Sequence, residues 1–376
     1  MKTADTLHLV SFDVPYPPDY GGAIDVFNKI KALNQVGVKV ILHCFSYGRP
    51  VHGKLNEVCE KVFVYKRMAG LSGLVSGLPY IVNSRRNATL LENLCATDAP
   101  VLFEGIHSCY YLNHPRLANR LRLVRTHNVE HEYYRGLSQA TASPLRKLFF
   151  RREARLLEKF EKSLKGANQI LAISPNDAKH FNDRYGNTVL IPPFHGNQTH
   201  EISGGKGDYI LFHGNLGVEE NNMAALFLCR EVFPHLSGPC IIAGKNPGNE
   251  LRRICSGLPQ VELFDGLSHE EISDLVKKAG ANLLVTFQNT GIKLKLINAL
   301  FSGGTCIVNR PMVEGTGLEK LCHVGNTAGD LIALCEGALN NALPESCPEA
   351  ERKKILEHNF SDRENAGKIK SLLRTR

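Results

Sequence analysis

The sequence contains no run of about 20 apolar residues, which is the length that a helix needs to cross a membrane. Its first residues, from Met1 to Asp5, lead into a strand-like segment without the basic and apolar regions of a secretory signal peptide. Both absences favour a cytoplasmic protein. Any contact with a membrane is then expected to be peripheral, on the inner face.

Cysteine pairs with metal-binding spacing are also missing. Eleven cysteines are scattered along the chain, no two of them form a C-x-x-C pair, and their number is odd. This usage is typical of a reducing compartment, where thiols such as Cys44, Cys240 and Cys306 serve as small buried apolar residues. We expect no structural zinc.

Two nucleotide-binding fingerprints are absent as well. Gly21 and Gly22 follow the first apolar run, but no G-x-G-x-x-G surrounds them. The Gly-Gly-Lys-Gly at 204–207 lacks both the glycine four residues earlier and the Ser or Thr that a Walker loop requires. Gly21 and Gly22 therefore fit either a plain turn or a backbone surface that a phosphate or sugar can approach closely.

Acidic residues are scarce in the first half of the chain. Residues 1–196 hold 26 Lys and Arg against 16 Asp and Glu, a net +10, whereas the remainder holds 19 against 21, a net −2. Residues 145–165 combine an apolar stripe with eight basic side chains. Such a helix either lies on an anionic membrane or packs its stripe on its own domain. No basic–aromatic platform or known motif accompanies the charge, so we expect no nucleic-acid partner.

The chain does contain a long alternation of apolar runs and helical patterns. Strands are predicted at 7–14, 38–45, 61–65, 101–103, 121–124, 169–173 and 188–191, with helices between them. A Pro- and Gly-rich segment at 192–208 then precedes a second series of strands, at 209–213, 240–243, 261–264, 283–287 and 306–308. This alternation predicts the α/β class, with Rossmann-like, doubly wound domains at 1–196 and 208–350.

The helix predicted at 292–302 has an unusual start. Its first turn carries Lys293 and Lys295 and no acid, although the positive end of a helix normally takes Asp or Glu. Either the two lysines are solvated or an anion such as phosphate lies beside them. Lys245 also follows a strand of this domain, and ligands of open α/β sheets bind at the carboxyl ends of the strands. We expect Lys245, Lys293 and the amides after Gly291 to meet a phosphate there.

Several stretches resemble the GT-B class of glycosyltransferases, and in particular its family-four group of retaining enzymes. The similar stretches are P-Y-P-P-D-Y-G-G at 15–22, R-T-H-N-V-E at 125–130, I-S-P-N-D at 173–177, and G-x-K-x-K from Gly291 followed by Gly303. Together they cover essentially the whole chain. The resemblance implies two Rossmann-like domains facing a cleft, with a C-terminal helical segment at 351–376 that returns to the first domain.

The resemblance also implies an activity. It implies transfer of a sugar, with retention and without a metal or cofactor, from a nucleotide-diphosphate donor to a glycan or lipid-linked acceptor. A role in cell-surface polysaccharide or glycolipid synthesis would follow. The implied catalytic residues are His127, beside the transferred sugar, and Lys245 and Lys293, on the leaving pyrophosphate. The implied donor-binding residues are Gly21, Gly22, Gly214, Asn215, Thr290, Gly291, Lys295, Asn298 and Glu314.

The chain departs from the family pattern at two positions and in one segment, 214–222, which has no Arg or Lys. The family usually has glutamates where this chain has Thr290 and Asn298, and it often has Arg and Lys in the segment that corresponds to 214–222. A second hypothesis is therefore a non-catalytic GT-B-like partner subunit with a degenerate donor site. A third is a sugar-nucleotide epimerase, but the cluster of catalytic acids and bases expected of one does not stand out.

Overall fold

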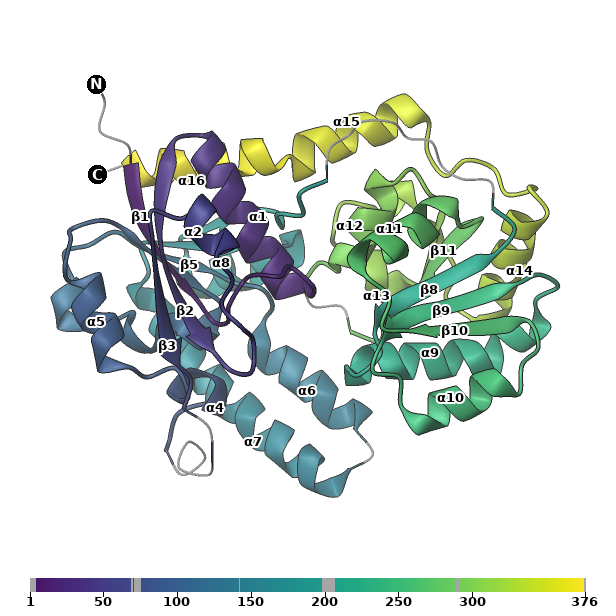
Figure 1. Ribbon diagram of the computed structural model, residues 1–376, viewed down its shortest axis with the longest axis horizontal. Coiled ribbons are helices and arrows are strands. Elements are labelled where there is room, and N and C mark those ends of the chain that lie inside the picture. Colours follow the sequence, from purple (N-terminus) through teal and green to yellow (C-terminus); the bar gives the residue numbers. More distant parts are fainter. Residues whose placement is uncertain are drawn as a thin grey trace. The chain divides into compact units, whose positions relative to one another are not determined.

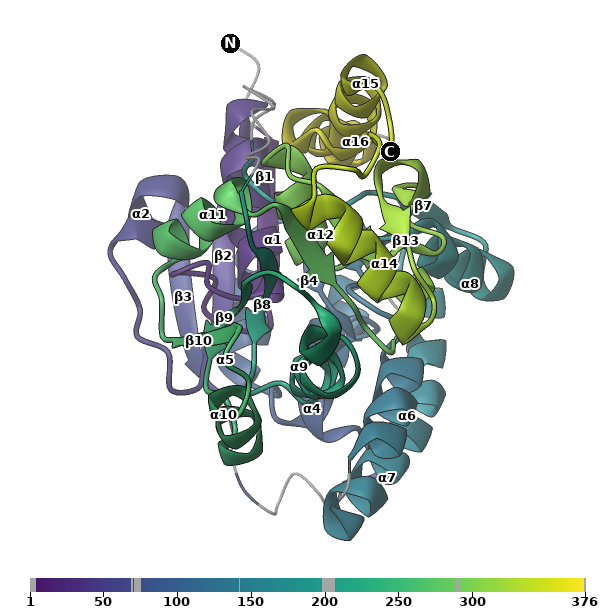
Figure 2. The same ribbon diagram turned by 90° about the vertical axis from the view of Figure 1, so that its right-hand side faces the viewer.

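The computed structural model describes residues 5–68, 70, 76–141, 143–197, 207–288 and 291–374 (Figures 1 and 2). The chain divides into two compact units. Unit 1 contains Met1–Ser138, Ser143–Gly196 and Phe360–Arg376, and unit 2 contains Gln139–Ala142 and Asn197–Asn359. Among the described helices, none is long and apolar enough to cross a bilayer.

Unit 1 is built on a seven-stranded parallel sheet. Its strands are β1 (Asp5–Ser11), β2 (Val38–Ser46), β3 (Lys61–Lys66), β4 (Val101–Glu104), β5 (Arg122–Arg125), β6 (Gln169–Ala172) and β7 (Thr188–Leu190). They lie in the order β3-β2-β1-β4-β5-β6-β7. The order reverses between β1 and β4, and this switch point is where doubly wound sheets bind ligands.

Helices cover both faces of this sheet. They are α1 (Gly21–Gln35), α2 (Lys54–Val58), α4 (Tyr80–Asn83), α5 (Ala88–Leu94), α6 (Glu130–Ala140), α7 (Pro144–Glu161), α8 (Pro175–Tyr185) and the C-terminal α16 (Asp362–Arg374). Leu7 and Leu9 of β1 pack with α1 and α16, and Val10 packs in the core of the opposite face. Helix α16 lies beside α1 (Figure 1), so the end of the chain returns to the first unit.

Unit 2 repeats the architecture with six parallel strands. They are β8 (Ile210–Asn215), β9 (Cys240–Lys245), β10 (Val261–Asp265), β11 (Ala281–Leu284), β12 (Cys306–Val308) and β13 (His323–Val324), in the order β10-β9-β8-β11-β12-β13. The helices are α9 (Glu219–Glu231), α10 (Asn249–Ser256), α11 (His269–Lys278), α12 (Leu294–Phe301), α13 (Arg310–Val313), α14 (Ala328–Leu339) and α15 (Glu349–Phe360). Here the order reverses between β8 and β11. The predicted α/β class with two doubly wound sheets is confirmed.

Strand β11 begins and ends earlier than the predicted 283–287. It starts at Ala281, which pairs with Ile210 of β8. After Leu284 the backbone of Thr286 leaves the ladder, because its N–H and C=O bond the side-chain amide of Asn309 at 3.0 and 2.7 Å. The cause is a side chain far along the sequence, which periodicity does not report. Other predicted elements differ at their ends too. The strand predicted at 7–14 is β1, which ends at Ser11, the helix predicted at 292–302 is α12, which begins at Leu294, and the long basic helix is α7, which ends at Glu161.

All eleven cysteines are free thiols, and only Cys95 is partly exposed. Their burial in the two units matches their use as small apolar residues.

Candidate active site

Five titratable side chains converge at the carboxyl end of the unit 1 sheet. They are Asp25 and Lys29 of α1, Glu104 at the end of β4, Arg125 at the end of β5, and His127. The Lys29 ammonium donates to both oxygens of Glu104, at 2.7 and 2.8 Å, and to Asp25 at 2.9 Å. Arg125 donates to Asp25 at 3.2 Å. Two cations therefore neutralise two carboxylates beside the switch point, with every member except His127 buried.

Both carboxyl groups of this cluster stay ionised. Burial opposes the charge of Asp25, but Arg125 and Lys29 outweigh it and hold the pKa of that carboxyl below its usual range. Burial also opposes the charge of Glu104, and Lys29 and His127 likewise bring the pKa of its carboxyl below the usual value. Removing one member would leave a buried charge uncompensated, which is far more costly than losing an exposed pair.

His127 is the member of the cluster that reaches solvent, with 12% of its side chain exposed. Its Nε2 lies 3.1 Å from Glu104, and because a carboxylate only accepts, Nε2 carries a proton and donates. The Phe12 ring stands edge-on to the imidazole, with centroids 5.3 Å apart. A neutral His127 would then present Nδ1 as an acceptor.

The same cluster offers ligand atoms to a metal, but they are already occupied. One atom each of Asp25, Glu104 and His127 lies within 4.8 Å of the others. The Lys29 ammonium, however, sits against both carboxylates. A divalent cation would have to displace it, so we interpret the cluster as an ion-pair network.

The segment after His127 leads into α6 through a buried acid. Glu130, the first residue of α6, is buried, and burial raises the pKa of its carboxyl to about 7, against an opposing hydrogen bond from Asn128. A carboxyl whose pKa lies near neutrality is typical of functional sites, although structural networks perturb pKa values too.

Gly21 and Gly22 form the first turn of α1, next to this cluster. That turn carries no acid, and Tyr20 at its N-cap provides no side-chain cap. A Cβ on Gly22 would stand 2.6 Å from the tip of the Phe12 ring, so glycine is needed for this contact. The N-terminus of α1 thus offers backbone N–H groups close to Phe12, which packs against His127. Such groups can donate hydrogen bonds to an anion or to a sugar hydroxyl.

In unit 2 the predicted glycines and Lys245 meet at the ends of β8 and β9. Gly214 pairs with Gly244, and Asn215 pairs with Lys245. The Lys245 side chain is exposed, and its carbonyl accepts from the Gly217 N–H at 3.1 Å.

Gly244 allows the two strands to approach at this point, and replacing it with alanine tests that role. A Cβ there would lie 2.0 Å from the Gly214 carbonyl oxygen, a backbone atom that cannot move aside. We expect Gly244→Ala to lower the free energy of unfolding of unit 2 by about 1–3 kcal/mol, measured by chemical denaturation. Gly367→Ala in α16, where an added Cβ meets nothing within 4 Å, should be neutral or stabilising. Equal destabilisation by both would contradict the close-approach explanation.

The lysines at the start of α12 have an internal anion. Lys293 is the N-cap of α12, and its ammonium lies 3.4 Å from Glu220, in the first turn of α9. The Glu220 carboxylate also accepts from the Thr286 hydroxyl, just beyond β11. Sequence reasoning did not identify Glu220, which lies in the segment where the family often has basic residues. Its position near the start of a helix after β8 was the only available signal.

Lys295 is half-buried, in the first turn of the same helix. Its ammonium donates to Asn221 at 3.0 Å and lies 4.9 Å from the centroid of the Phe212 ring. Burial lowers the pKa of Lys295 to about 8, with Glu220 acting in the opposite direction and Lys293 in the same one. Of the two lysines, Lys293 stands at the N-cap of the helix, whereas Lys295 is held by Asn221 and the Phe212 ring.

The other predicted donor-binding residues differ in their surroundings. Gly291 has φ +67°, a conformation that favours glycine. The Asn298 side-chain oxygen accepts from the Asn197 amide at 2.7 Å. Glu314 is exposed after α13, 4.0 Å from Arg310. Thr290 lies outside the described residues. His127, Gly21 and Gly22 belong to unit 1, and the remaining predicted residues belong to unit 2.

Solved structures with this architecture include glycosyltransferases. A glycosyltransferase from Rickettsia africae is 14% identical, with complete coverage of both chains and a TM-score of 0.65. WaaG, a glycosyltransferase involved in lipopolysaccharide biosynthesis, is 12% identical, with 98% of this chain and 100% of that chain covered and a TM-score of 0.66. Anabaena HepE, in complex with UDP and glucose, is 11% identical, with 99% and 100% covered and a TM-score of 0.66. The fold is that of the GT-B glycosyltransferases.

Within this GT-B fold, one curated relative matches most of the chain. It is an uncharacterized 44.6 kDa protein in the cps region of Klebsiella pneumoniae, 24% identical over 340 residues, with 85% of this chain and 80% of the relative covered. No protein-family model matches. Both clusters described above lie at switch points of GT-B sheets: the His127 cluster beside β1 and β4, and the Lys293 cluster beside β8 and β11.

Proposed function

We propose that the protein is a glycosyltransferase that transfers a sugar from a nucleotide-diphosphate donor to a glycan or lipid-linked acceptor, with retention and without a metal. The observation that carries this proposal is the position of Lys293. It stands at the N-terminus of α12, beside the β8–β11 switch point of a GT-B sheet, where a helix start without acids favours an anion.

The leaving diphosphate would be stabilised electrostatically. Lys293 is held in place by Glu220, and Lys245 ends the strand on the other side of β8, about 10 Å from β11 by ordinary strand spacing. The backbone after Gly291 and the start of α12 add N–H donors. Preorganised donors and cations of this kind act on charge as it develops on the leaving group.

His127 would lie beside the transferred sugar or the acceptor hydroxyl. Glu104 fixes its Nε2–H, so that Nδ1 is left to accept from a hydroxyl. Glu104 is thus a positioning residue in this proposal. No carboxylate is assigned as nucleophile, and the leaving phosphate would help to deprotonate the acceptor.

The similar proteins support a role in polysaccharide synthesis, and one of them indicates which sugar donor to test first. The curated relative belongs to a cps region, and WaaG acts in lipopolysaccharide biosynthesis. HepE is bound to UDP and glucose. We therefore propose synthesis of a cell-surface polysaccharide such as a capsule, with UDP-sugars as the leading donor candidates.

A nucleotide screen tests this function. The unfolding temperature of the protein would be measured with UDP, GDP and ADP and with their sugars, followed by calorimetry and an assay for donor turnover. We expect one nucleoside diphosphate to raise the unfolding temperature and to bind in the micromolar range or tighter. No binding by any of them would contradict the enzyme proposal.

One observation favours the alternative of a non-catalytic partner subunit. Asn298, at the position where the family usually has a ribose-binding glutamate, is already hydrogen-bonded to Asn197. An amide is also a weaker acceptor for a ribose hydroxyl than a carboxylate. Nucleotide binding without turnover of any donor would favour this alternative.

We also propose that α7 carries a peripheral membrane contact. Leu145 and Leu148 have 82% and 68% of their surface exposed, unusually much for leucine. A shallow hollow of about 320 Å³ follows them along the helix, lined by Leu148, Arg151, Arg152, Arg155, Leu156 and Lys159. Apolar side chains beside a basic row are typical of helices that lie on anionic membranes.

Co-sedimentation with vesicles tests the α7 contact. At low salt we expect binding to vesicles that contain anionic lipid and none to neutral ones, with binding weakened as the ionic strength rises. Leu145→Ser/Leu148→Ser should release most of the bound protein. Val51→Ser, at an exposed apolar position outside α7, should not. Equal binding of the double variant and the wild type would contradict a contact through α7.

A further inference from the structure

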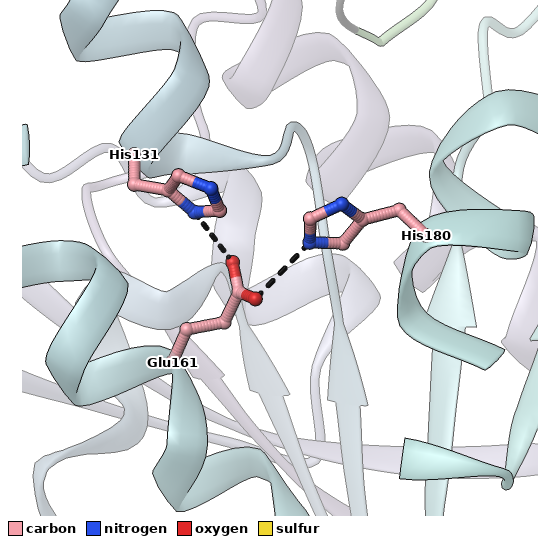
Figure 3. Close-up of side chains that lie close together, drawn as sticks. All are labelled: His131, Glu161 and His180. Atoms are coloured by element: carbon pink, nitrogen blue, oxygen red, sulfur yellow. Dashed lines mark hydrogen bonds and ion pairs between the residues drawn. The ribbon is translucent and has the colours of Figure 1, made fainter. Parts of the chain in front are cut away.

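A second cluster of titratable side chains lies in unit 1, on helices that the proposed reaction does not use. His131 of α6, Glu161 at the end of α7 and His180 of α8 point toward one another (Figure 3). The His131 Nδ1 lies 2.8 Å from one carboxylate oxygen, and the His180 Nε2 lies 3.1 Å from the other. The Tyr185 hydroxyl donates to the same oxygen as His180, at 3.0 Å.

The carboxylate at the centre of this cluster has no strong cation of its own. Glu161 is 3% exposed, and in the described part of the chain its ion-pair partners are the two imidazoles. Two other buried carboxylates of unit 1, Asp25 and Glu104, differ in this respect, since both pair with Lys29. Each oxygen of the Glu161 carboxylate thus faces an imidazole nitrogen, and carboxylate oxygens and imidazole nitrogens are both zinc ligands.

We propose that His131, Glu161 and His180 bind a zinc ion, with Tyr185 or a water molecule completing the coordination. Two nitrogens and a carboxylate suit Zn²⁺ and not Mg²⁺ or Ca²⁺, which take oxygen ligands. Tetrahedral ligands at about 2.1 Å from zinc lie about 3.4 Å apart. One ligand atom from each of the three residues lies within 4.8 Å of the others, so the site closes on an ion if the two imidazoles move toward one oxygen of Glu161.

Arg184 makes a hydrogen bond to His180 that zinc binding would have to break. Its Nη1 lies 2.8 Å from the His180 Nδ1, and because a guanidinium only donates, Nδ1 accepts and the ring proton stays on Nε2. Zinc on Nε2 requires that proton to move to Nδ1, so Arg184 must swing away. Arg184 is exposed and can do so. If the two histidines are neutral before zinc binds, each keeps its one proton, which then lies on the ring nitrogen that does not bind the metal. If a ring is protonated, it releases one proton to solvent on binding.

The bound ion would clamp three helices and would take no part in sugar transfer. It would tie α6, which begins just after His127, to α7 and α8. The cysteine spacing gives no sign of such a site, because its ligands come from separate helices and include no cysteine.

Metal analysis of untagged protein tests the site. We expect about one zinc per chain after equilibration with Zn²⁺ and gel filtration, a higher unfolding temperature with zinc than with EDTA, and a visible absorption band on Co²⁺ substitution. His180→Ala and Glu161→Gln should reduce zinc affinity at least 100-fold. Arg184→Ala should tighten it by about 10-fold, a change of the size that neighbours of metal ligands produce.

His52→Ala, at an exposed histidine outside the cluster, is the matched control and should keep wild-type affinity. Arg184→Ala alters only an exposed side chain, so it remains informative even if a core variant fails to fold. Absence of stoichiometric zinc in the wild type would overturn the proposal. So would equal affinity in the wild type and His180→Ala, which would leave the three side chains as a hydrogen-bonded link between helices.

Discussion

Replacing Lys293 with alanine is expected to weaken the binding of the nucleoside diphosphate by about 1.5–3 kcal/mol, or roughly 10- to 150-fold in Kd. The ammonium stands at the N-cap of α12 with part of its surface open, and its removal leaves Glu220 as an unpaired negative charge beside the ligand. Binding of the corresponding nucleoside should hardly change, since it has no phosphate to lose. Calorimetry with the diphosphate and the nucleoside measures both.

Two further variants separate the sources of this effect. Glu220→Gln removes the negative charge and keeps Lys293, so it should bind the diphosphate at least as tightly as the wild type. Lys320→Ala removes a lysine that is 80% exposed elsewhere in unit 2, and it should leave affinity unchanged. An equal loss for nucleoside and diphosphate in Lys293→Ala would contradict the phosphate role of this residue.

Replacing Glu104 with glutamine is expected to lower the free energy of unfolding of unit 1 by about 3–5 kcal/mol. The glutamine side chain would keep the shape but not the charge, so Lys29 would share Asp25 with Arg125 as its remaining carboxylate. Glutamine also has one acceptor oxygen in place of two, so Lys29 and the His127 Nε2–H would compete for it. Chemical denaturation measures the stability, and kcat should fall in the folded variant more than KM changes.

The stability effect has a defined pH dependence. The pKa of Glu104 is lower in the folded protein than in the unfolded chain, so its stabilisation is fully present above the unfolded value of about 4.3. It is lost as the pH falls through the folded pKa. The difference between wild type and Glu104→Gln should therefore be constant near neutrality and shrink in acid.

Glu92→Gln is the matched control for this variant. Glu92 also pairs with an arginine, Arg116, but that pair lies at the surface, with 64% and 45% of the two side chains exposed. Water replaces the lost partner there, so no measurable change is expected. A comparable loss of stability in both variants would show that burial does not determine how much the Glu104 ion pairs contribute to the free energy of unfolding.

The two sheets were predictable because their signals are local. Apolar runs of strand length alternate with helical patterns, and the Pro- and Gly-rich segment at 192–208 interrupts them. The lysines at the start of α12 were also visible, since the missing acid is a departure from a rule about one helical turn. Gly21, Gly22, Gly214 and Gly291 were recognisable as turn or close-approach positions for the same reason.

The partners of these residues were not predictable, because they depend on which strands become neighbours. Lys29 and Glu104 are 75 residues apart and meet only because β4 takes its place beside β1, next to α1. Glu220 meets Lys293 because β11 lies beside β8. Asp25 and Lys29 were visible in the sequence only as charged residues on the buried face of a helix. A sequence pattern alone does not identify the residues that they contact.

The sequence by itself thus determined the class of fold, the order of its elements and the lysine-bearing helix start, since these follow from periodicity and from rules that act within a few residues. Only the tertiary structure decided that Lys293 pairs with Glu220 and Lys295 with Asn221, that His127 is held by Glu104, and that His131, Glu161 and His180 converge. The physical reason is that ion pairs and ligand sets act over a few ångströms in space, whatever the separation along the chain.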